Sequence, residues 1–138
     1  MKKNIVFIIL ILVFLEVSTE GFSQTEKVKK PTKKNLTVKE WNTNSDTKTK
    51  FLDHVSIFND LGLKIEEIEY ANYGIKSKIV YEYDTNKRCI QQTEYDGRER
   101  VVEIKKFEYN VDGTKKKQST YNPKGKLISE KEFEYIYK

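Results

Sequence analysis

Few side chains in this sequence could carry out chemistry. His54 is its only histidine and Cys89 its only cysteine. A serine or cysteine nucleophile activated by an imidazole would therefore depend on His54, with Ser56 two positions away on the same side of a strand. One histidine cannot supply a histidine pair to a metal ion. We expect no catalytic residue and no metal site, and we expect His54 to be a partly exposed strand residue.

Carboxylates are more abundant and occur in short runs. A pair of carboxylates could serve as the acid and base of a glycosidase. One run, however, alternates along the chain, which would place its members on one face of a strand beside lysines, as on a solvated sheet face. We therefore expect a structural role for these runs, which are Glu66, Glu67 and Glu69, and Glu130, Glu132 and Glu134.

The turn residues give no sign of a bound cofactor. Acidic residues such as Asp84 and Asp96 occur one per turn, without the dense set of oxygen ligands that a calcium loop needs. The glycines are spaced with the turns and form neither a phosphate-binding loop nor a dinucleotide-binding motif. We expect no cofactor.

Aromatic residues make up 12% of the chain and admit two interpretations. Their rings could form the core of a thin sheet, or rows of rings flanked by Lys and Arg could stack on sugars. Three of the tyrosines, Tyr73, Tyr121 and Tyr137, lie near turns or ends, where a ring stays accessible. The candidate binding residues are Tyr73, Tyr81, Tyr83, Tyr95, Tyr109, Tyr121 and Tyr137.

The elements that must position these side chains follow an N-terminal targeting segment. Lys2 and Lys3 precede an apolar run of 11 residues from Ile5 to Leu15, and Gly21 and Ser23 follow, which is the layout of a secretory signal peptide. Such a run spans about 16 Å as a helix, short of the ~30 Å hydrocarbon core. We expect residues 1–23 to be removed and the mature chain to be periplasmic or secreted and not membrane-spanning.

Residues 24–50 carry the positive charge of the mature chain. This segment contains eight lysines and three acidic residues, whereas the basic and acidic residues of 51–138 are equal in number. This segment is poor in apolar residues, so we expect a flexible leader. It is either a solvated leader or a tether that makes peripheral contact with an anionic envelope surface. Leu36, Val38 and Trp41 suggest a short strand or docking segment within it. The tether residues would be Lys27, Lys29, Lys30, Lys33 and Lys34.

From Phe58 onward the sequence repeats. An aromatic residue recurs every 12 to 14 residues and is in most cases followed by Asn or Asp, and the triplets that begin at Tyr81, Phe107 and Phe133 are 26 residues apart. Turn residues alternate with eight to ten residues of strand character, and such short connections join only antiparallel neighbours. Residues 51–57 could be the first strand or a short helix. The pattern predicts an all-β domain over residues 51–138, an antiparallel meander of about six to seven strands with the aromatic rings in a ladder on one face.

The turn motifs resemble those of a known class of repeat proteins. Tyr95-Asp96-Gly97-Arg98 and, more loosely, the segments 109–113 and 121–126 look like the YD repeats of Rhs-type and wall-associated bacterial proteins, and are similar to the hairpin repeats of MORN-like antitoxin-component proteins. The resemblance covers roughly residues 58–137. It implies a β-hairpin architecture and contact with carbohydrate or protein. The chain has too few units to enclose a toxin, so the shell role of long Rhs arrays does not carry over.

Three functions remain open at this stage. The first is a non-enzymatic interaction module that binds an envelope protein or glycan, without nucleic acid as a partner. The second is an immunity or antitoxin-like protein that binds a cognate toxin. The third is an accessory subunit of an envelope assembly. Pairing through a sheet edge, with a partner strand or a second copy, is a natural mechanism because a meander has two open edges.

Overall fold

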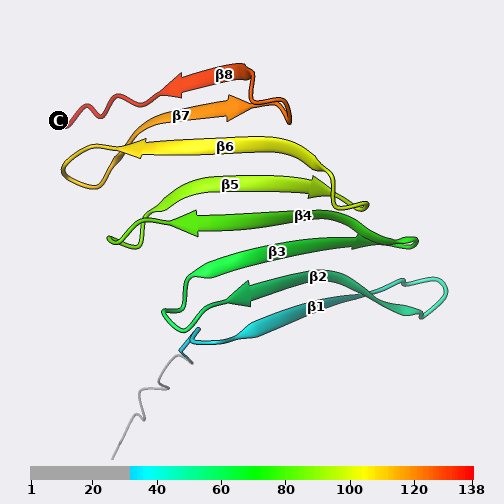
Figure 1. The fold of residues 1–138 in the computed structure, drawn as a ribbon. Helices are drawn as coiled ribbons and strands as arrows, with labels where there is room; N and C mark the ends of the chain where they lie inside the picture. The colour runs from blue at the N-terminus through cyan, green and yellow to red at the C-terminus, as the bar shows by residue number, and fades with distance from the viewer. Residues whose placement is uncertain (1–31) are drawn as a thin grey trace, which may run out of the picture. The chain divides into compact units, whose positions relative to one another are not determined.

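The computed structural model describes residues 32–138, which form one all-β unit. Lys27, Lys29, Lys30 and the predicted signal peptide lie outside the described residues. Eight antiparallel strands follow one another across a single sheet in chain order, which confirms the predicted meander (Figure 1). Residues 32–138 contain no helix that could cross a membrane. The strands are β1 (Thr37–Thr43), β2 (Lys50–Phe58), β3 (Lys64–Ala71), β4 (Gly74–Tyr83), β5 (Cys89–Asp96), β6 (Val101–Tyr109), β7 (Lys115–Tyr121) and β8 (Leu127–Glu132).

The sheet begins earlier than the sequence pattern predicts. Strand β1 lies inside the stretch 24–50, and it pairs with β2 along its length. The backbone N–H of Phe58 donates to the carbonyl of Leu36 at 2.9 Å, so the pairing continues ahead of β1. The weak alternation of Leu36, Val38 and Trp41 was therefore a strand signal, and β1 raises the number of strands to eight. Residues 51–57 belong to β2 and not to a helix.

Five of the connections share one turn geometry. Each begins with an Asn or Asp whose N–H donates to the carbonyl four residues later at 2.8–2.9 Å, and whose own carbonyl accepts from the N–H three residues later at 2.9–3.0 Å. In four of them the side-chain oxygen of this residue also accepts two backbone N–H groups of the turn. The fourth residue always has positive φ, and it is Gly62, Lys87, Glu99, Gly113 or Gly125.

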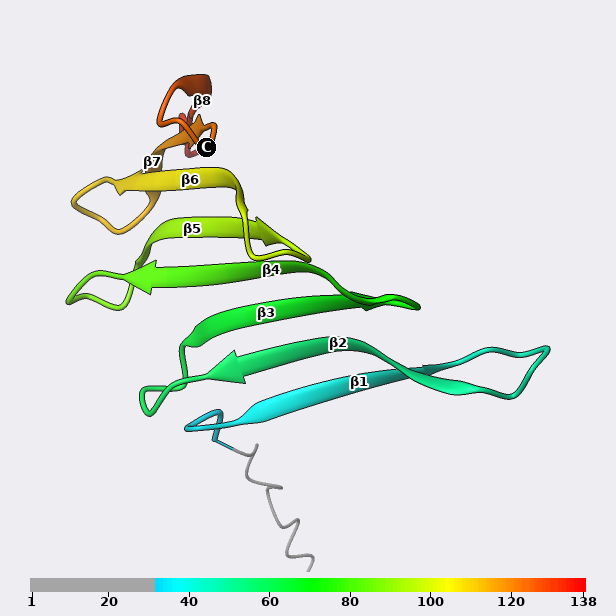
Figure 2. The same ribbon diagram turned by 45° about the vertical axis from the view of Figure 1, so that its right-hand side comes forward.

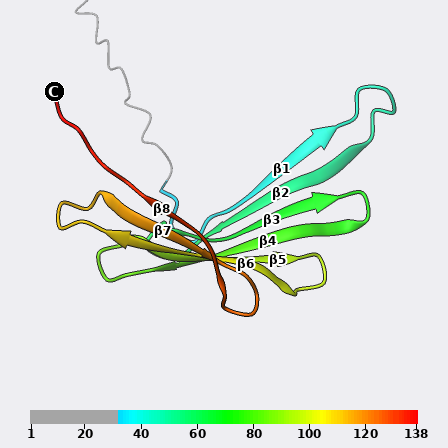
Figure 3. The ribbon, with the colours of Figure 1, turned by 90° about the horizontal axis from the view of Figure 1, so that it is seen from above.

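A register shift accompanies every pair of neighbouring strands. In each pair the second strand contributes one extra residue next to an aromatic residue of the first, as Ile90 does beside Tyr83. Such bulges increase the local twist of a sheet, and seen from above the strand directions turn steadily from β1 to β8 (Figure 3). The aromatic residues at these shifts are Trp41, Phe58, Tyr70, Tyr83, Tyr95, Tyr109 and Tyr121.

The rings do not form one ladder, contrary to the sequence prediction. Tyr95 lies opposite Lys78 and shares its face of the sheet, whereas Tyr83 comes five residues after Lys78 in the same strand and lies on the other face. The same count in β6 separates the ring of Tyr109 from that of Tyr121. The aromatic rows at the two ends of the strands therefore occupy opposite faces.

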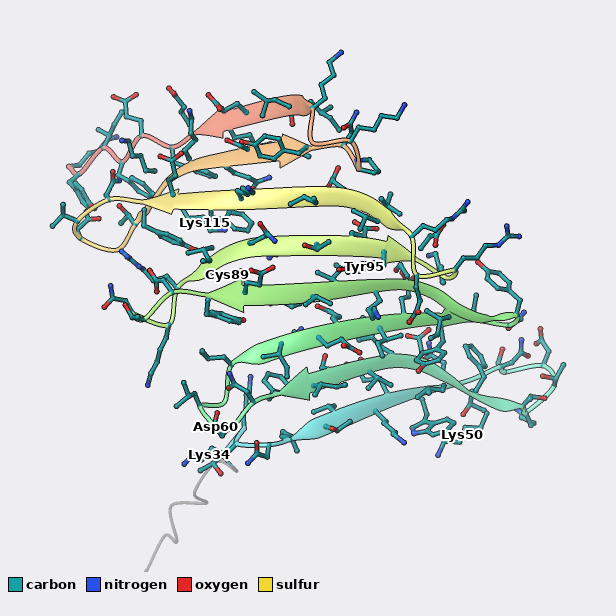
Figure 4. All side chains as sticks on the ribbon, viewed as in Figure 1. Lys34, Lys50, Asp60, Cys89, Tyr95 and Lys115 are labelled. Carbon is teal, nitrogen blue, oxygen red and sulfur yellow. The ribbon has the colours of Figure 1, made fainter. Side chains whose placement is uncertain are left out.

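Alternate turns lie at the same end of the sheet, which is why the clearest repeat is 26 residues long. Connections β2–β3, β4–β5 and β6–β7 lie at one end, which we call the Asp84 end, and the other four lie at the Tyr73 end (Figure 1). Asp60, Cys89 and Lys115 mark the Asp84 end, and Lys50 and Tyr95 lie toward the Tyr73 end (Figure 4).

The described strands form a single layer (Figure 2), so the sheet has little interior. Val55 and Phe107 are the buried apolar side chains of residues 32–138, and no large side chain there is completely enclosed. Instead, long cationic side chains each lie over one aromatic ring, with the cation 4.5–5.5 Å from the centre of that ring. The pairs are Lys33–Phe58, Lys50–Trp41, Lys78–Tyr95, Arg88–Tyr109, Lys106–Tyr121 and Lys115–Phe107.

The last strand is shorter than the repeat predicts. The 26-residue spacing aligns Phe133 and Tyr135 with Phe107 and Tyr109 of β6, but β8 ends at Glu132. Strand β6 is held by neighbours on both sides, whereas β8 pairs only with β7 in the described residues. One bond, from the Phe133 N–H to the Lys116 carbonyl at 3.1 Å, continues the pairing past Glu132.

The turn geometry predicts which substitutions stabilise the sheet. Lys87 and Glu99 adopt φ of 64° and 60°, where glycine meets no steric cost. Lys87→Gly and Glu99→Gly should each raise the free energy of unfolding by about 0.5–1 kcal/mol, because relief of strain exceeds the added entropy of the unfolded chain. Urea unfolding monitored by circular dichroism measures the change.

A matched control lies one residue away. Asn86 belongs to the same turn as Lys87 but has no positive φ. Asn86→Gly should lower the free energy of unfolding, because glycine there adds only unfolded-state entropy. Equal effects of the glycine substitutions at positions 86 and 87 would contradict the strain argument.

Candidate functional site

The structure separates the seven candidate tyrosines into packed and accessible rings. Tyr73 and Tyr137 are 80% and 81% exposed, whereas the other five are half-buried in strands. Tyr121, expected to stay accessible, lies under the ammonium group of Lys106. Tyr137 follows β8 and contributes to no strand. Tyr73 is therefore the candidate ring that is both exposed and held between two paired strands.

Two of the half-buried tyrosines have a structural role. The hydroxyl of Tyr83 donates to the carbonyl of Lys64 at 2.7 Å, and that of Tyr109 donates to the carbonyl of Cys89 at 2.7 Å. Both bonds reach from the end of one strand to the start of its predecessor, 19 and 20 residues away. The 26-residue repeat of Tyr83 and Tyr109 therefore reflects an internal contact that recurs along the chain and not a binding surface.

A polar cluster on one face contains the only histidine. The Glu67 carboxylate accepts hydrogen bonds from the Tyr81 hydroxyl at 2.5 Å and from the Lys64 ammonium at 3.1 Å, and it lies 2.6 Å from His54 Nε2. These side chains come from β2, β3 and β4, so the cluster joins three strands. Ser56, the residue that would pair with His54 in catalysis, is buried.

Burial and hydrogen bonding act together on the pKa values of Glu67 and Tyr81. Burial alone would raise the pKa of Glu67, but the bonds from Tyr81, Lys64 and His54 together lower it below its ordinary value. Burial, followed by the bond to the Glu67 carboxylate, raises the pKa of Tyr81 well above its ordinary value. Glu67 is therefore a stable anion and Tyr81 a stable donor near neutral pH. The arrangement stabilises the sheet and does not prepare a nucleophile.

An open cleft lies at the Tyr73 end of the sheet. It encloses about 580 Å³ between the β3–β4 and β5–β6 connections. The β3–β4 connection is short, because Ala71 pairs with Gly74 and leaves two residues at the tip. The lining residues are Tyr73, Ile75, Lys76, Asp96, Gly97, Arg98 and Arg100.

One wall of this cleft is rigid because of an ion pair inside the turn. Both Nε and a terminal nitrogen of Arg100 contact Asp96 Oδ2, at 2.8 and 2.6 Å. The side-chain bond from Arg100, with backbone N–H groups of the turn, lowers the pKa of Asp96 to about 2. The same pairing joins Arg88 to Asp84 in the β4–β5 turn, so it is a property of the turn and not of the cleft.

Arg98 is the basic residue of the cleft that forms no ion pair in residues 32–138. Arg100 is held by Asp96, and Lys76 is held by Glu69 at 2.7 Å. The backbone N–H of Arg98 is fixed by Asp96 Oδ1 at 2.9 Å, while its side chain is exposed. Sequence reasoning did not select Arg98. When the turns are aligned, the arginine bound by the aspartate stands four residues after it, as Arg100 does after Asp96. Arg98 stands only two residues after Asp96, so the alignment would have indicated that it is not the bound arginine.

Three further observations complete the description of these residues. No group of three or more His, Cys, Asp or Glu side chains within residues 32–138 is arranged to hold a metal ion. Cys89 is a free, half-buried thiol, and burial raises its pKa. Of the proposed tether lysines, Lys33 lies over the Phe58 ring beside the β2–β3 turn, and Lys34 is exposed.

Comparison with known proteins does not identify a family. No protein-family model matches the chain, and no curated protein sequence matches it. A structure of a mutant of TarM from S. aureus with fondaparinux, α-GlcNAc-glycerol and UDP matches 70% of this chain and 22% of its own, at 14% identity and a TM-score of 0.33. A GtfA/B complex bound to UDP and GlcNAc matches 64% and 23%, at 15% identity and a TM-score of 0.19. The chain thus spans under a quarter of these proteins, and likeness this weak carries no argument.

The Glu67 cluster predicts a pH-dependent effect of Tyr81→Phe. The low pKa of Glu67 means that its ionised form stabilises the fold above pH ~4.5, a contribution lost as the pH falls through the folded-state pKa. Removing the hydroxyl should lower the free energy of unfolding by about 1 kcal/mol at pH 7 and by less at pH 3. Urea unfolding at the two pH values measures both changes.

Tyr83→Phe is the matched control for this experiment. It removes a hydroxyl whose acceptor is the Lys64 carbonyl, which does not titrate. Its effect should be the same at pH 7 and pH 3. If both variants show the same pH dependence, the assignment to the Glu67 carboxylate is wrong.

Gly97 should be intolerant of a side chain. A Cβ at this position would lie 2.2 Å from the carbonyl oxygen of Ile75, which is backbone and cannot move without disturbing β4. Gly125→Ala introduces strain at φ 77° but meets open space. We expect Gly97→Ala to lower the free energy of unfolding by more than the ~1 kcal/mol of Gly125→Ala. Thermal unfolding of both variants provides the comparison, and equal losses would show that the turn does not press on Ile75.

Proposed function

We propose that this protein is a non-enzymatic interaction module of the cell envelope, periplasmic or secreted, that binds an envelope component. The single observation that supports this most is the cleft at the Tyr73 end. There an exposed aromatic ring and a guanidinium group that forms no ion pair within residues 32–138 line one open cleft at the ends of the strands. Exposed aromatic and arginine side chains are typical of recognition surfaces.

The remaining features agree with binding. The histidine of the chain is engaged by Glu67, and its neighbour Ser56 is buried. These side chains therefore contribute to the stability of the sheet. The signal peptide and the resemblance to YD-repeat proteins are expectations from sequence that favour the same compartment and the same kind of contact. Residues 24–31 would add an electrostatic attraction to anionic surfaces.

A second candidate function is binding of a protein partner, as an immunity protein or an assembly subunit would do. The two edge strands, each with a single neighbouring strand within residues 32–138, favour it. Most side chains of β1 and all side chains of β8 are exposed. Edge strands offer unpaired backbone groups to a partner strand.

Capture from envelope fractions tests the proposal. The immobilised chain should retain an envelope component at low salt, and this component should be lost at high salt because contact with Arg98 is electrostatic. Periodate, which cleaves sugars, should abolish capture of a glycan, whereas protease should leave it intact. Protease-sensitive capture would instead support the protein partner. No specific retention in either treatment would overturn both candidates.

The position of β1 determines the control. Removing residues 24–50 would delete an edge strand, so the leader should be shortened only over residues 24–31. If capture is lost in this variant while circular dichroism shows an intact sheet, the leader and not the cleft is the binding element.

A further inference from the structure

We infer that the cleft at the Tyr73 end binds a saccharide that carries a carboxylate, such as a uronic acid. This inference rests on the proposed binding function and names the ligand class of the same site. It follows from three properties of the cleft: an exposed ring on one side, an arginine on the other that has no ion pair in the part of the chain that the structure describes, and an open volume between them.

The ring side provides an apolar surface for a sugar. Tyr73 stands at the tip of the β3–β4 connection with 80% of its surface exposed, and Ile75 next to it is 40% exposed. The C–H face of a pyranose packs on an aromatic face, while the tyrosine hydroxyl remains available to sugar hydroxyls. A ligand that covers this ring removes apolar surface from water, because no cationic side chain in residues 32–138 lies over the ring as Lys78 lies over Tyr95.

The charged side of the cleft selects an anion. Two nearby carboxylates already form ion pairs, Asp96 with Arg100 and Glu69 with Lys76. Arg98 therefore gives the cleft a positive charge that no carboxylate of residues 32–138 pairs with. A guanidinium binds a carboxylate through two parallel hydrogen bonds, which fix the orientation of the group. The ammonium of Lys76 can add a longer-range attraction.

The wall formed by the β5–β6 turn is positioned before any ligand arrives. The β5–β6 turn is braced by Asp96 and lies against the Ile75 carbonyl at Gly97, so the backbone that carries Arg98 is held close to β4. A volume of about 580 Å³ is in the range of small-molecule sites, ~300–1,000 Å³. Because the cleft is open, a longer chain of sugars can extend beyond it.

An acidic peptide is the competing ligand class. It would satisfy Arg98, but its flexible side chains would leave the flat ring of Tyr73 largely uncovered. A sugar acid combines a rigid apolar face and a carboxylate in one residue, and it therefore matches both sides of the cleft. Peptide binding is accordingly an outcome of the test and not part of the inference.

Isothermal titration calorimetry of the full chain with trigalacturonate tests this inference. We expect binding that weakens with salt and is lost with the fully methyl-esterified trisaccharide, which keeps the rings but removes the charge. Tyr73→Ala and Arg98→Ala should each weaken binding by about tenfold. Both side chains are exposed, so circular dichroism and urea unfolding should show an unchanged sheet.

Two matched controls are available in the chain. Lys124 occupies the turn position equivalent to Arg98, at the same end of the sheet but outside the cleft, and Tyr137 is as exposed as Tyr73. Lys124→Ala and Tyr137→Ala should change the affinity by less than about twofold. Losses as large as those of the cleft variants would show nonspecific attraction and overturn the site.

The remaining outcomes separate this inference from the proposed function. Equal binding of the methyl ester, or equal binding of tetraglutamate, would exclude a carboxylated sugar as the preferred ligand. Capture of an envelope component without binding of trigalacturonate would overturn the ligand class and leave the binding function intact. Absence of both would overturn both.

Discussion

The sheet depends on the covering of aromatic rings by long charged side chains of neighbouring strands. A second layer would normally bury these rings, but residues 32–138 provide only one layer of strands. The ammonium groups of Lys78 and Lys106 lie over the rings of Tyr95 and Tyr121 and shield them from water. High charge and high aromatic content, which look contradictory for a folded domain, are therefore two parts of one arrangement.

This arrangement limits how a sequence of this kind can be interpreted. The meander itself could be predicted, because aromatic and Asn or Asp residues recur at hairpin spacing and short turns allow only antiparallel neighbours. The first strand was harder to predict, because β1 lies in a lysine-rich segment and is held largely by pairing with β2. The repeat also predicts a longer β8 than the structure has. Strand β6 extends to Tyr109 because it has a neighbouring strand on each side, whereas β8 has one within residues 32–138.

The candidate site could be predicted only in part. Tyr73 was selected because it lies near a turn, but the candidate binding residues also included Tyr83 and Tyr109, whose hydroxyls donate to backbone carbonyls. The reason is that a bulge at each hairpin shifts the register by one residue, and simple alternation does not reveal which face a ring occupies. Arg98 escaped notice because its role depends on which other charges are already paired, and that information exists only in three dimensions.

The recurring turn has a consequence for variation. Its backbone is held by the first residue and by the φ of the fourth. In the β6–β7 turn the third residue, Asp112, also accepts bonds from the N–H and the hydroxyl of Thr114. In the other four turns the third residue contributes little to the geometry, and it is Leu61, Asn86, Arg98 or Lys124. These positions differ in charge and polarity while the surrounding frame stays the same. A change of one such side chain can thus alter what an end of the sheet recognises without a compensating change elsewhere, which gives this small scaffold a means of diversifying its specificity at low structural risk.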